Sequence, residues 1–373
     1  MAHALIITSS QHDPWYNLAL EDYLMGMLSD SLTLQTGDAA PMQSGTENRP
    51  ADLLQAILYL WQNDNAVVIG RNQNAWVECL TGQLEAEGGK LARRSTGGGA
   101  VFHDLGNLNF SLILPRSSFR LDDNFSMIVD ALASLGVSAE RTGRNDITVG
   151  GLKFSGNAFS LRRAVGLHHG TLLIHSEYSR VARYLTVNPA KLQARGVNSV
   201  HARITNLQAI KPEITVELMA KAMEAAFIAH FCTNQLCSNP LEDKHACRII
   251  RQTDDLISRD QRFEALHEHY ASWQWRYGET IQFDALIEQK YTWGMLHLGF
   301  QIDQGLVRRA TIYSDALDSD FIARLADVFQ GCRFHSADLA AALGGLTDLD
   351  GGFGTSRRQM VADVKALILE QNW

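Results

Sequence analysis

The sequence predicts an α+β fold. A large first domain on a mixed sheet would span residues 1–278, and a small α+β accessory domain would span residues 279–373. Expected strands and helices alternate irregularly, without the strand–helix rhythm of a parallel sheet. Each expected helix carries one apolar stripe and should therefore pack on a sheet face. The chain of 373 residues is long enough for two domains, and its composition changes after Trp273 and Trp275.

Elements of the first domain are expected in the following order. Residues 1–8 favour a strand, and apolar residues at helical spacing from Tyr16 to Leu28 predict an amphipathic helix. Residues 29–50 are rich in Ser, Thr, Gly, Asp and Gln, which indicates a flexible insertion. Strands are then expected at 66–70, 90–94, 101–102, 107–114, 146–149, 152–155 and 169–174, and helices at 123–135 and 215–230.

The second domain is expected to begin near Gly278. Residues 283–311 favour strands, most clearly at 295–302, and two helical patterns follow around 321–329 and 360–368. A unit of roughly ninety residues can hold a core of its own.

Composition argues against several classes of function. A net charge of −8 without a basic stripe speaks against nucleic acid as a partner. No apolar run approaches the ~18 residues of a membrane span. Residues 1–8 lack the basic start of a signal peptide, so we expect a cytoplasmic protein.

The cysteines do not indicate a disulfide or zinc framework. The chain has five, an odd and scattered set. Cys232, Cys237, His245 and Cys247 crowd together, but their spacing lacks the paired C-x2-C clips of structural zinc sites. We expect reduced structural thiols.

The glycine-rich block at residues 91–104 is the most informative feature of the chain. Two arginines, three consecutive glycines and an apolar exit describe a backbone that approaches an anion closely. The planar guanidinium group of arginine can donate two hydrogen bonds at once to a phosphate or a carboxylate. Residues 104–112 then alternate polar and apolar, so the loop leads directly into a half-buried strand.

Two more blocks follow, at residues 143–158 and 168–174. They contain a Gly-Arg-Asn-Asp run, a single lysine flanked by glycines, and a His-His-Gly-Thr run. The chain has no P-loop and no dinucleotide fingerprint. An anion-binding glycine loop, one lysine, an Asn-Asp pair and two histidines match the requirements for activating a carboxylic acid with ATP.

In this order the blocks resemble the lipoate–protein ligase family, within the biotin/lipoate protein ligase superfamily. The resemblance includes residues 13–19 and 68–76 and covers most of the chain. It implies that lipoate and ATP, with Mg²⁺, form lipoyl-AMP. The lipoyl group would then pass to a lysine of lipoyl domains, on 2-oxoacid dehydrogenase E2 subunits and the glycine-cleavage H protein. The resemblance also implies a C-terminal accessory domain, and we expect a monomer without membrane or nucleic-acid partners.

The resemblance also assigns residues. Lys153 would be catalytic, touching the acid carbonyl and the α-phosphate together. Asn145 and Asp146 could hydrogen-bond adenine or ribose, or help place Mg²⁺. Trp76 fits a pocket wall or the plain core, His103 and His168 fit buried supporting positions, and Ser160 replaces a family arginine, which puts one phosphate contact in doubt. Binding of ATP and lipoyl-AMP would involve Arg94, Gly97, Gly98, Gly99, Ala100, Val101, Phe102, Asn145, Asp146, Lys153 and Ala158, and binding of lipoate Trp76, Arg94, His103, Lys153 and His169.

Two alternatives remain at this point. A lipoyltransferase or octanoyltransferase of the same fold would use a cysteine nucleophile, yet no cysteine lies between Leu91 and His175. A non-catalytic module that binds lipoyl domains would not need Lys153 and the whole glycine block.

Overall fold

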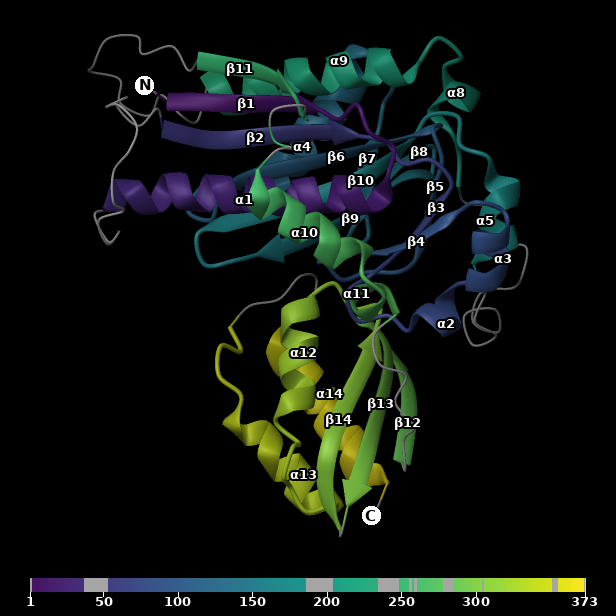
Figure 1. Cartoon of the computed structure of the whole chain (residues 1–373), viewed down its shortest axis with the longest axis vertical. Coiled ribbons are helices and arrows are strands. Elements are labelled where there is room, and N and C mark those ends of the chain that lie inside the picture. The colour runs from purple at the N-terminus through teal and green to yellow at the C-terminus, as the bar shows by residue number, and fades with distance from the viewer. Residues whose placement is uncertain are drawn as a thin grey trace.

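The computed structural model describes residues 2–36, 53–185, 204–233, 248–254, 257, 260–277, 285–303, 305–350, 355–371 and 373. A large sheet unit lies above a smaller one in Figure 1, with helices on both faces of the large sheet. The α+β prediction with a mixed sheet is confirmed.

The central sheet has eight strands in the order β11-β1-β2-β6-β10-β9-β8-β7. Strands β11, β1 and β2 run parallel, and the remaining neighbours are antiparallel. The bounds are β1 Ala2–Thr8, β2 Leu53–Trp61, β6 Asn107–Pro115, β7 Glu140–Thr142, β8 Asp146–Val149, β9 Leu152–Leu161, β10 Val165–Leu173 and β11 Arg248–Thr253.

Register assigns the two neighbouring histidines of β10 to opposite faces of this sheet, because side chains alternate along a strand. His168 pairs with Leu112 and Phe159, and this face packs on α4 (Leu121–Ser134) and α9 (Val216–Phe227). His169 pairs with Ser111 and is on the face that packs on α1 (Pro14–Thr36) and α10 (Gln261–Ala271).

A small sheet in the order β4-β3-β5 lies beside the central one. We call residues 94–100, between β4 and β5, the glycine loop. The bounds are β3 Ala66–Ile69, β4 Lys90–Arg93, β5 Val101–His103, α2 Ala75–Glu78, α3 Thr81–Ala86, α5 Tyr178–Tyr184, α8 Leu207–Ile210 and α11 Trp273–Tyr277, with a π-helix at Ile228–Thr233.

The C-terminal unit packs helices on one antiparallel sheet. Its core includes the buried side chains of Trp293, Phe300, Phe321 and Phe329. The bounds are β12 Ala285–Tyr291, β13 Gly294–Asp303, β14 Leu306–Ser314, α12 Ser319–Asp327, α13 Ser336–Ala342 and α14 Arg357–Glu370, with a 3-10 turn at Leu343–Gly345.

Helix α1 runs further than its sequence suggests. A loop was expected from Ser29, but the helix continues to Thr36 because Leu28 is buried and Leu32 packs on the same core. Thr33 Oγ1 also donates to the carbonyl of Ser29, at 2.9 Å. The rest of the expected insertion, and the boundary near Gly278, lie outside the described residues.

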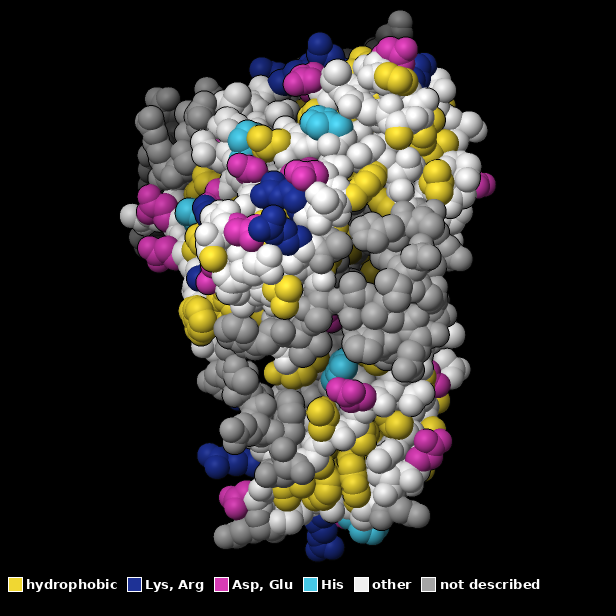
Figure 2. Space-filling view, turned by 90° about the vertical axis from the view of Figure 1, so that its right-hand side faces the viewer, with side chains coloured by type: hydrophobic (Ala, Val, Ile, Leu, Met, Phe, Trp, Pro, Cys, Tyr) yellow, Lys and Arg dark blue, Asp and Glu magenta, His cyan; other side chains and the backbone are white. Residues whose placement is uncertain are grey.

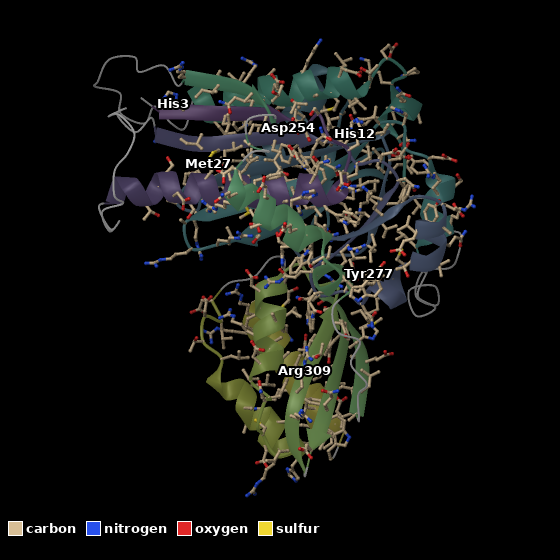
Figure 3. All side chains as sticks on the ribbon, in the orientation of Figure 1. His3, His12, Met27, Asp254, Tyr277 and Arg309 are labelled. Carbon is tan, nitrogen blue, oxygen red and sulfur yellow. The ribbon has the colours of Figure 1, made fainter. Side chains whose placement is uncertain are left out.

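Arg93 joins the linker helix α11 to the unit that contains the central sheet. Its guanidinium donates to the carbonyls of Trp275 (2.8 Å) and Arg276 (2.9 Å) and to that of Gln73 (2.6 Å). Trp275 Nε1 donates back to the Arg93 carbonyl at 2.8 Å. The neighbouring Tyr277 lies at the junction of the two units (Figure 3). Arg93 therefore anchors the chain where it passes into the C-terminal unit.

We expect Arg93→Met to lower the free energy of unfolding by about 2–4 kcal/mol, because several buried carbonyls lose a charged donor. Urea denaturation measures this. Arg71→Met is the matched control: its guanidinium pairs with Asp320 in an exposed ion pair, which contributes only about 0–1 kcal/mol. Equal effects of the two substitutions would contradict the anchoring role of Arg93.

Candidate active site at the glycine loop

A cavity of about 170 Å³ lies between the glycine loop and the α1 face of the central sheet. The three sequence blocks, far apart along the chain, meet in its wall. The predicted residues found there are Arg94, Gly98, Gly99, Ala100, Val101, His103, Asn145, Lys153, Ala158 and His169. The wall also contains Leu18, Trp61, Val68, Asn109, Gly156, Asn157, Gly170 and Thr171.

Lys153 lies near the start of β9, in a hairpin with β8. Its Nζ is 2.7 Å from Oδ1 of Asp146, and both side chains are about one-third exposed. A Cβ on Gly156 would come within 3.3 Å of Nζ, so glycine at this position leaves room for the lysine chain. The backbone of Lys153 also accepts a 2.8 Å hydrogen bond from Thr205 N. The ammonium is thus held at the cavity wall by one carboxylate.

Arg94 shapes the glycine loop from within. Its Nη2 donates to the carbonyls of Gly97 (2.7 Å) and Gly99 (2.8 Å), and Nη1 donates to that of Val68 (3.2 Å). Burial lowers the pKa of the guanidinium to about 10. In the structure most of its donors bind loop carbonyls, and the contact of Arg94 with phosphate stays a prediction. The backbone amides of the loop are therefore the better candidates for anion contacts.

The glycine loop also touches the C-terminal unit. Gly98 N donates to the carbonyl of Ala316 at 3.2 Å, and Gly98 adopts φ +93°, a conformation that favours glycine. A Cβ on Gly97 would lie 2.0 Å from the Ala316 oxygen. Asn72 Nδ2 adds a 2.8 Å bond to the carbonyl of Ser319. Gly97 therefore lies at the contact between the two units and does not line the cavity.

A buried hydrogen-bond network connects α1 to the glycine loop. His169 Nδ1 lies 2.8 Å and 2.9 Å from the carboxylate oxygens of Glu21, and His169 Nε2 lies 2.7 Å from Thr96 Oγ1. Thr96 Oγ1 accepts from Arg94 Nε at 3.2 Å, and Ser111 Oγ donates to Glu21 at 2.6 Å. Glu21 is 2% exposed, and a buried carboxylate is tolerated only with such partners. The network holds His169 and the loop in a fixed relation.

Sequence reasoning missed Glu21, Thr96 and Trp61. The available signal for Glu21 was a charged residue among the apolar positions of α1, between the buried Leu20 and Leu24. Its partner His169 is 148 residues away in the sequence, so no local motif could connect them.

Asn145 fastens the hairpin that carries Lys153. Its Nδ2 donates to the carbonyl of Asn157 at 2.9 Å, and Asn157 Nδ2 donates back to the carbonyl of Asn145 at 3.0 Å. Asn157 Oδ1 lies 2.9 Å from His168 Nε2. His168 is fully buried, which places its pKa well below the usual value. It is a core residue, as predicted, on the opposite face from the cavity.

The remaining predicted residues lie as follows. Phe102 points into a separate apolar cluster, with its ring 5.6 Å from that of Tyr184. Asp146 does not line the cavity itself, but its carboxylate pairs with Lys153, which does. Ser160 is buried and lines a second cavity, of about 240 Å³, that includes Asp318 and Arg357 of the C-terminal unit. The side chain of Trp76 lies outside the described residues.

Metal and membrane signals are absent from the described part of the chain. No cluster of three His, Cys, Asp or Glu side chains there could hold a metal ion, and none of its helices is long and apolar enough to span a membrane.

Cys79 and Cys332 are free thiols. Cys237, His245, Cys247 and the side chain of Cys232 lie outside the described residues. On the face shown in Figure 2, basic side chains lie beside acidic ones.

We expect Thr96→Val to lower the free energy of unfolding by about 2 kcal/mol, because the buried His169 Nε2 and Arg94 Nε both lose a partner. Thr96→Ser keeps the hydroxyl and should remain within about 0.5 kcal/mol of the parent. Guanidinium denaturation of the three proteins measures the difference. A serine variant as unstable as the valine variant would mean that packing of the methyl group, not the hydroxyl, matters here.

Two family models match the chain. The lipoyl protein ligase A/B catalytic domain matches residues 13–228, and the C-terminus of bacterial lipoate protein ligases matches residues 280–364. Lipoate-protein ligase A of Psychrobacter cryohalolentis is 35% identical over 338 residues, which cover 90% of this chain and 90% of that protein.

Solved structures agree with these matches. The crystal structure of P. falciparum LipL1 in complex with lipoate has a TM-score of 0.77 at 28% identity, covering 99% of this chain and 100% of that one. A structure of lipoate-protein ligase A bound with ATP has a TM-score of 0.51 at 22% identity, over 74% of this chain and 99% of that one, and shares the fold. The chain belongs to the lipoate–protein ligase family.

Proposed function

We propose that this protein is an ATP-dependent lipoate–protein ligase that forms lipoyl-AMP and transfers the lipoyl group to a lysine of lipoyl-domain proteins. One observation carries the proposal beyond family membership. Lys153, the glycine-loop backbone and an apolar wall meet in one cavity, so a carboxylate, a phosphate and an alkyl tail each have a suitable surface.

In the first half-reaction, a carboxylate oxygen of lipoate attacks the α-phosphorus of ATP, and pyrophosphate leaves. Two negatively charged groups must approach each other, which requires cationic and amide donors around them. We assign Lys153 to contact both the acid oxygen and the α-phosphate. Amides of Gly99, Ala100 and Val101, which line the same cavity, would hold the nucleotide phosphates.

In the second half-reaction, the neutral ε-amine of the acceptor lysine attacks the carbonyl carbon of lipoyl-AMP. The new amide forms, AMP leaves with the bonding electrons of the anhydride, and the amine proton passes to solvent or phosphate. A mixed anhydride hydrolyses in water, so the adenylate must stay buried until the acceptor enters. The cavity between the loop and the sheet supports that requirement.

Asp146 is our candidate for placing Mg²⁺. One of its oxygens pairs with Lys153, and the described residues form no all-protein metal site. Mg²⁺ commonly binds through one or two carboxylates together with substrate phosphates and waters. The donor set therefore fits an ion that enters with ATP, with Asp146 as its protein ligand.

We further propose the division at residue 278, with an accessory domain after it, and a monomer acting in the cytoplasm. The two family models, ending at 228 and starting at 280, support that division. The acceptors would be lipoyl domains of 2-oxoacid dehydrogenase E2 subunits and the glycine-cleavage H protein, in line with the family.

A cysteine-based transferase has less support. Among the described cysteines, Cys79 is buried in the cluster around Leu84 and Tyr184 and does not line the cavity. Burial raises the pKa of its thiol to about 12, which disfavours the thiolate that a nucleophile needs.

Lys153→Ala should slow lipoate-dependent pyrophosphate release about 10²–10³-fold, the usual cost of losing one transition-state donor. The variant should stay folded because the side chain is part of a partly exposed hairpin. Lys290→Ala, on the exposed edge strand β12, is the control and should retain the parent rate. Near-normal pyrophosphate release by Lys153→Ala would refute the role of Lys153.

A chain ending at residue 278 should lose adenylate formation but keep measurable transfer from supplied lipoyl-AMP. The reason is that Ala316 and Ser319 contact the glycine loop, at Gly98 N (3.2 Å) and at the carbonyl of Ser95 (3.5 Å), and activation needs a fully assembled, water-poor site. Circular dichroism must first establish that the shortened protein is folded. If such a protein formed the adenylate at the full rate, the C-terminal unit would have no role in the first half-reaction.

A further inference from the structure

A β-bulge interrupts β9 directly after Lys153. In the hairpin with β8, Lys153 pairs with Thr148, but Ser155 pairs with Ile147. Phe154, which lies between them, is therefore an extra residue on β9 and pairs with no residue of β8. Side chains alternate between the two faces along a regular strand, and one extra residue reverses that alternation. The bulge thus determines the face on which Lys153 lies.

The positions of the neighbouring side chains show this reversal. Phe159 belongs to the core that packs on α4 and α9, while Gly156 and Ala158 line the cavity on the other face. With strict alternation, Phe154 would lie on the cavity face and Lys153 on the helix face. Instead, Phe154 is fully buried in the helix-side core and Lys153 lines the cavity. Without the bulge, the ammonium of Lys153 would be directed into an apolar core, where an unpaired charge is very costly.

The side chain of Asn157 connects the bulge to the start of β8. Its Nδ2 donates to Ser155 Oγ at 3.2 Å and to the carbonyl of Asn145 at 3.0 Å. The backbone N–H of Asn157 donates to the same carbonyl at 2.9 Å, and Asn145 Nδ2 donates to the carbonyl of Asn157 at 2.9 Å. Asn145 directly precedes Asp146, the ion-pair partner of Lys153. One amide therefore holds both the bulged strand and the residue next to Asp146.

His168 fixes the orientation of this amide from the face opposite the cavity. The carbonyl of Asn145 can only accept, so the atom of Asn157 that faces it is Nδ2, and the atom 2.9 Å from His168 Nε2 is Oδ1. His168 Nε2 therefore carries a hydrogen and donates it. Gly170, the pairing partner of Asn157 on β10, leaves room for this contact, because a Cβ there would collide with Oδ1. Three phenylalanine rings enclose the His168 ring, with centroids 4.7 Å, 4.9 Å and 5.4 Å away.

We infer that Asn157 is a positioning residue: its amide holds the bulge that directs Lys153 into the cavity and beside Asp146. This inference rests on the proposed function, in which Lys153 contacts the reacting groups. Strand β8 has only four residues, so few main-chain hydrogen bonds support the bulge. A slip of one residue moves each side chain to the other face of a strand. The buried amide, 3% exposed and with a partner for each of its hydrogens, opposes such a slip.

The first test compares rates of lipoate-dependent pyrophosphate release. Asn157→Ala removes the amide, and we expect kcat to fall about 10–10²-fold, the cost of displacing a catalytic group by about 1 Å. KM for lipoate should change less than about threefold, because the loss acts on the transition state through Lys153. Asp363→Ala is the control: it removes the acceptor of Trp293 Nε1 (2.8 Å) in the C-terminal unit and should lower stability while kcat stays at the parent value. A parent kcat in Asn157→Ala would overturn the inference.

A double-mutant cycle separates positioning from a general loss of stability. If Asn157 acts through Lys153, then Asn157→Ala should change the residual rate of a chain that already carries Lys153→Ala by no more than about twofold. A further loss of about tenfold in the double variant would contradict the inference, because the amide would then act independently of the lysine.

Crystal structures of the parent and of Asn157→Ala provide a readout that needs no activity. We expect the ion pair between Lys153 and Asp146 in the parent, and its loss in the variant, with Nζ and Oδ1 more than about 4 Å apart. A variant that keeps both the bulge and the ion pair would refute the role of Asn157, whatever the rates. If the variant loses them while the parent releases no pyrophosphate, the positioning role is supported and the ligase alone is refuted.

Discussion

The guanidinium of Arg94 holds the glycine loop by its carbonyls, and the rest of the site depends on this contact. The Gly97 and Gly99 oxygens bind Arg94, and the Gly98 amide binds the carbonyl of Ala316, so both ends of the loop backbone are held. Three consecutive glycines lose much conformational entropy on folding, and the hydrogen bonds from Arg94 offset part of that cost. The cation therefore shapes a neutral anion-binding surface. Its charge also lies beside the cavity, where it lowers the electrostatic potential energy of a bound phosphate.

Two consecutive arginines lie where β4 ends: Arg93 is its last residue and Arg94 begins the glycine loop. Arg94 binds the loop carbonyls, while Arg93 reaches the linker helix α11 and the turn after β3. That turn contacts the C-terminal unit through Asn72, whose carbonyl accepts from Ser314 N at 2.8 Å. The loop, the linker and the interface between the units are therefore joined through two consecutive residues.

The sequence was sufficient to predict the parts that local chemistry dictates. Strands beside the glycine block, the hairpin around Lys153 and the opposite faces of His168 and His169 all follow from period-two patterns and turn glycines. Glu21 could not be predicted, because its partners come from β6 and β10 and only folding brings them together. The end of α1 was misplaced because the polar composition after Ser29 concealed a single apolar stripe that continues to Leu32. Strand β11, with mostly exposed side chains, offers no alternation to detect.

Trp61 is a firmly held part of the cavity wall. Its indole nitrogen donates to Ser111 Oγ at 3.0 Å, and that hydroxyl is held in turn by Glu21. The ring is 4% exposed and stacks on Tyr59, with centroids 5.9 Å apart, so it has little freedom to move. The cavity wall includes residues of four neighbouring strands, β2, β6, β10 and β9, so the cavity crosses the sheet. A smaller residue at position 61 would therefore enlarge the cavity on its β2 side, three strands away from Lys153.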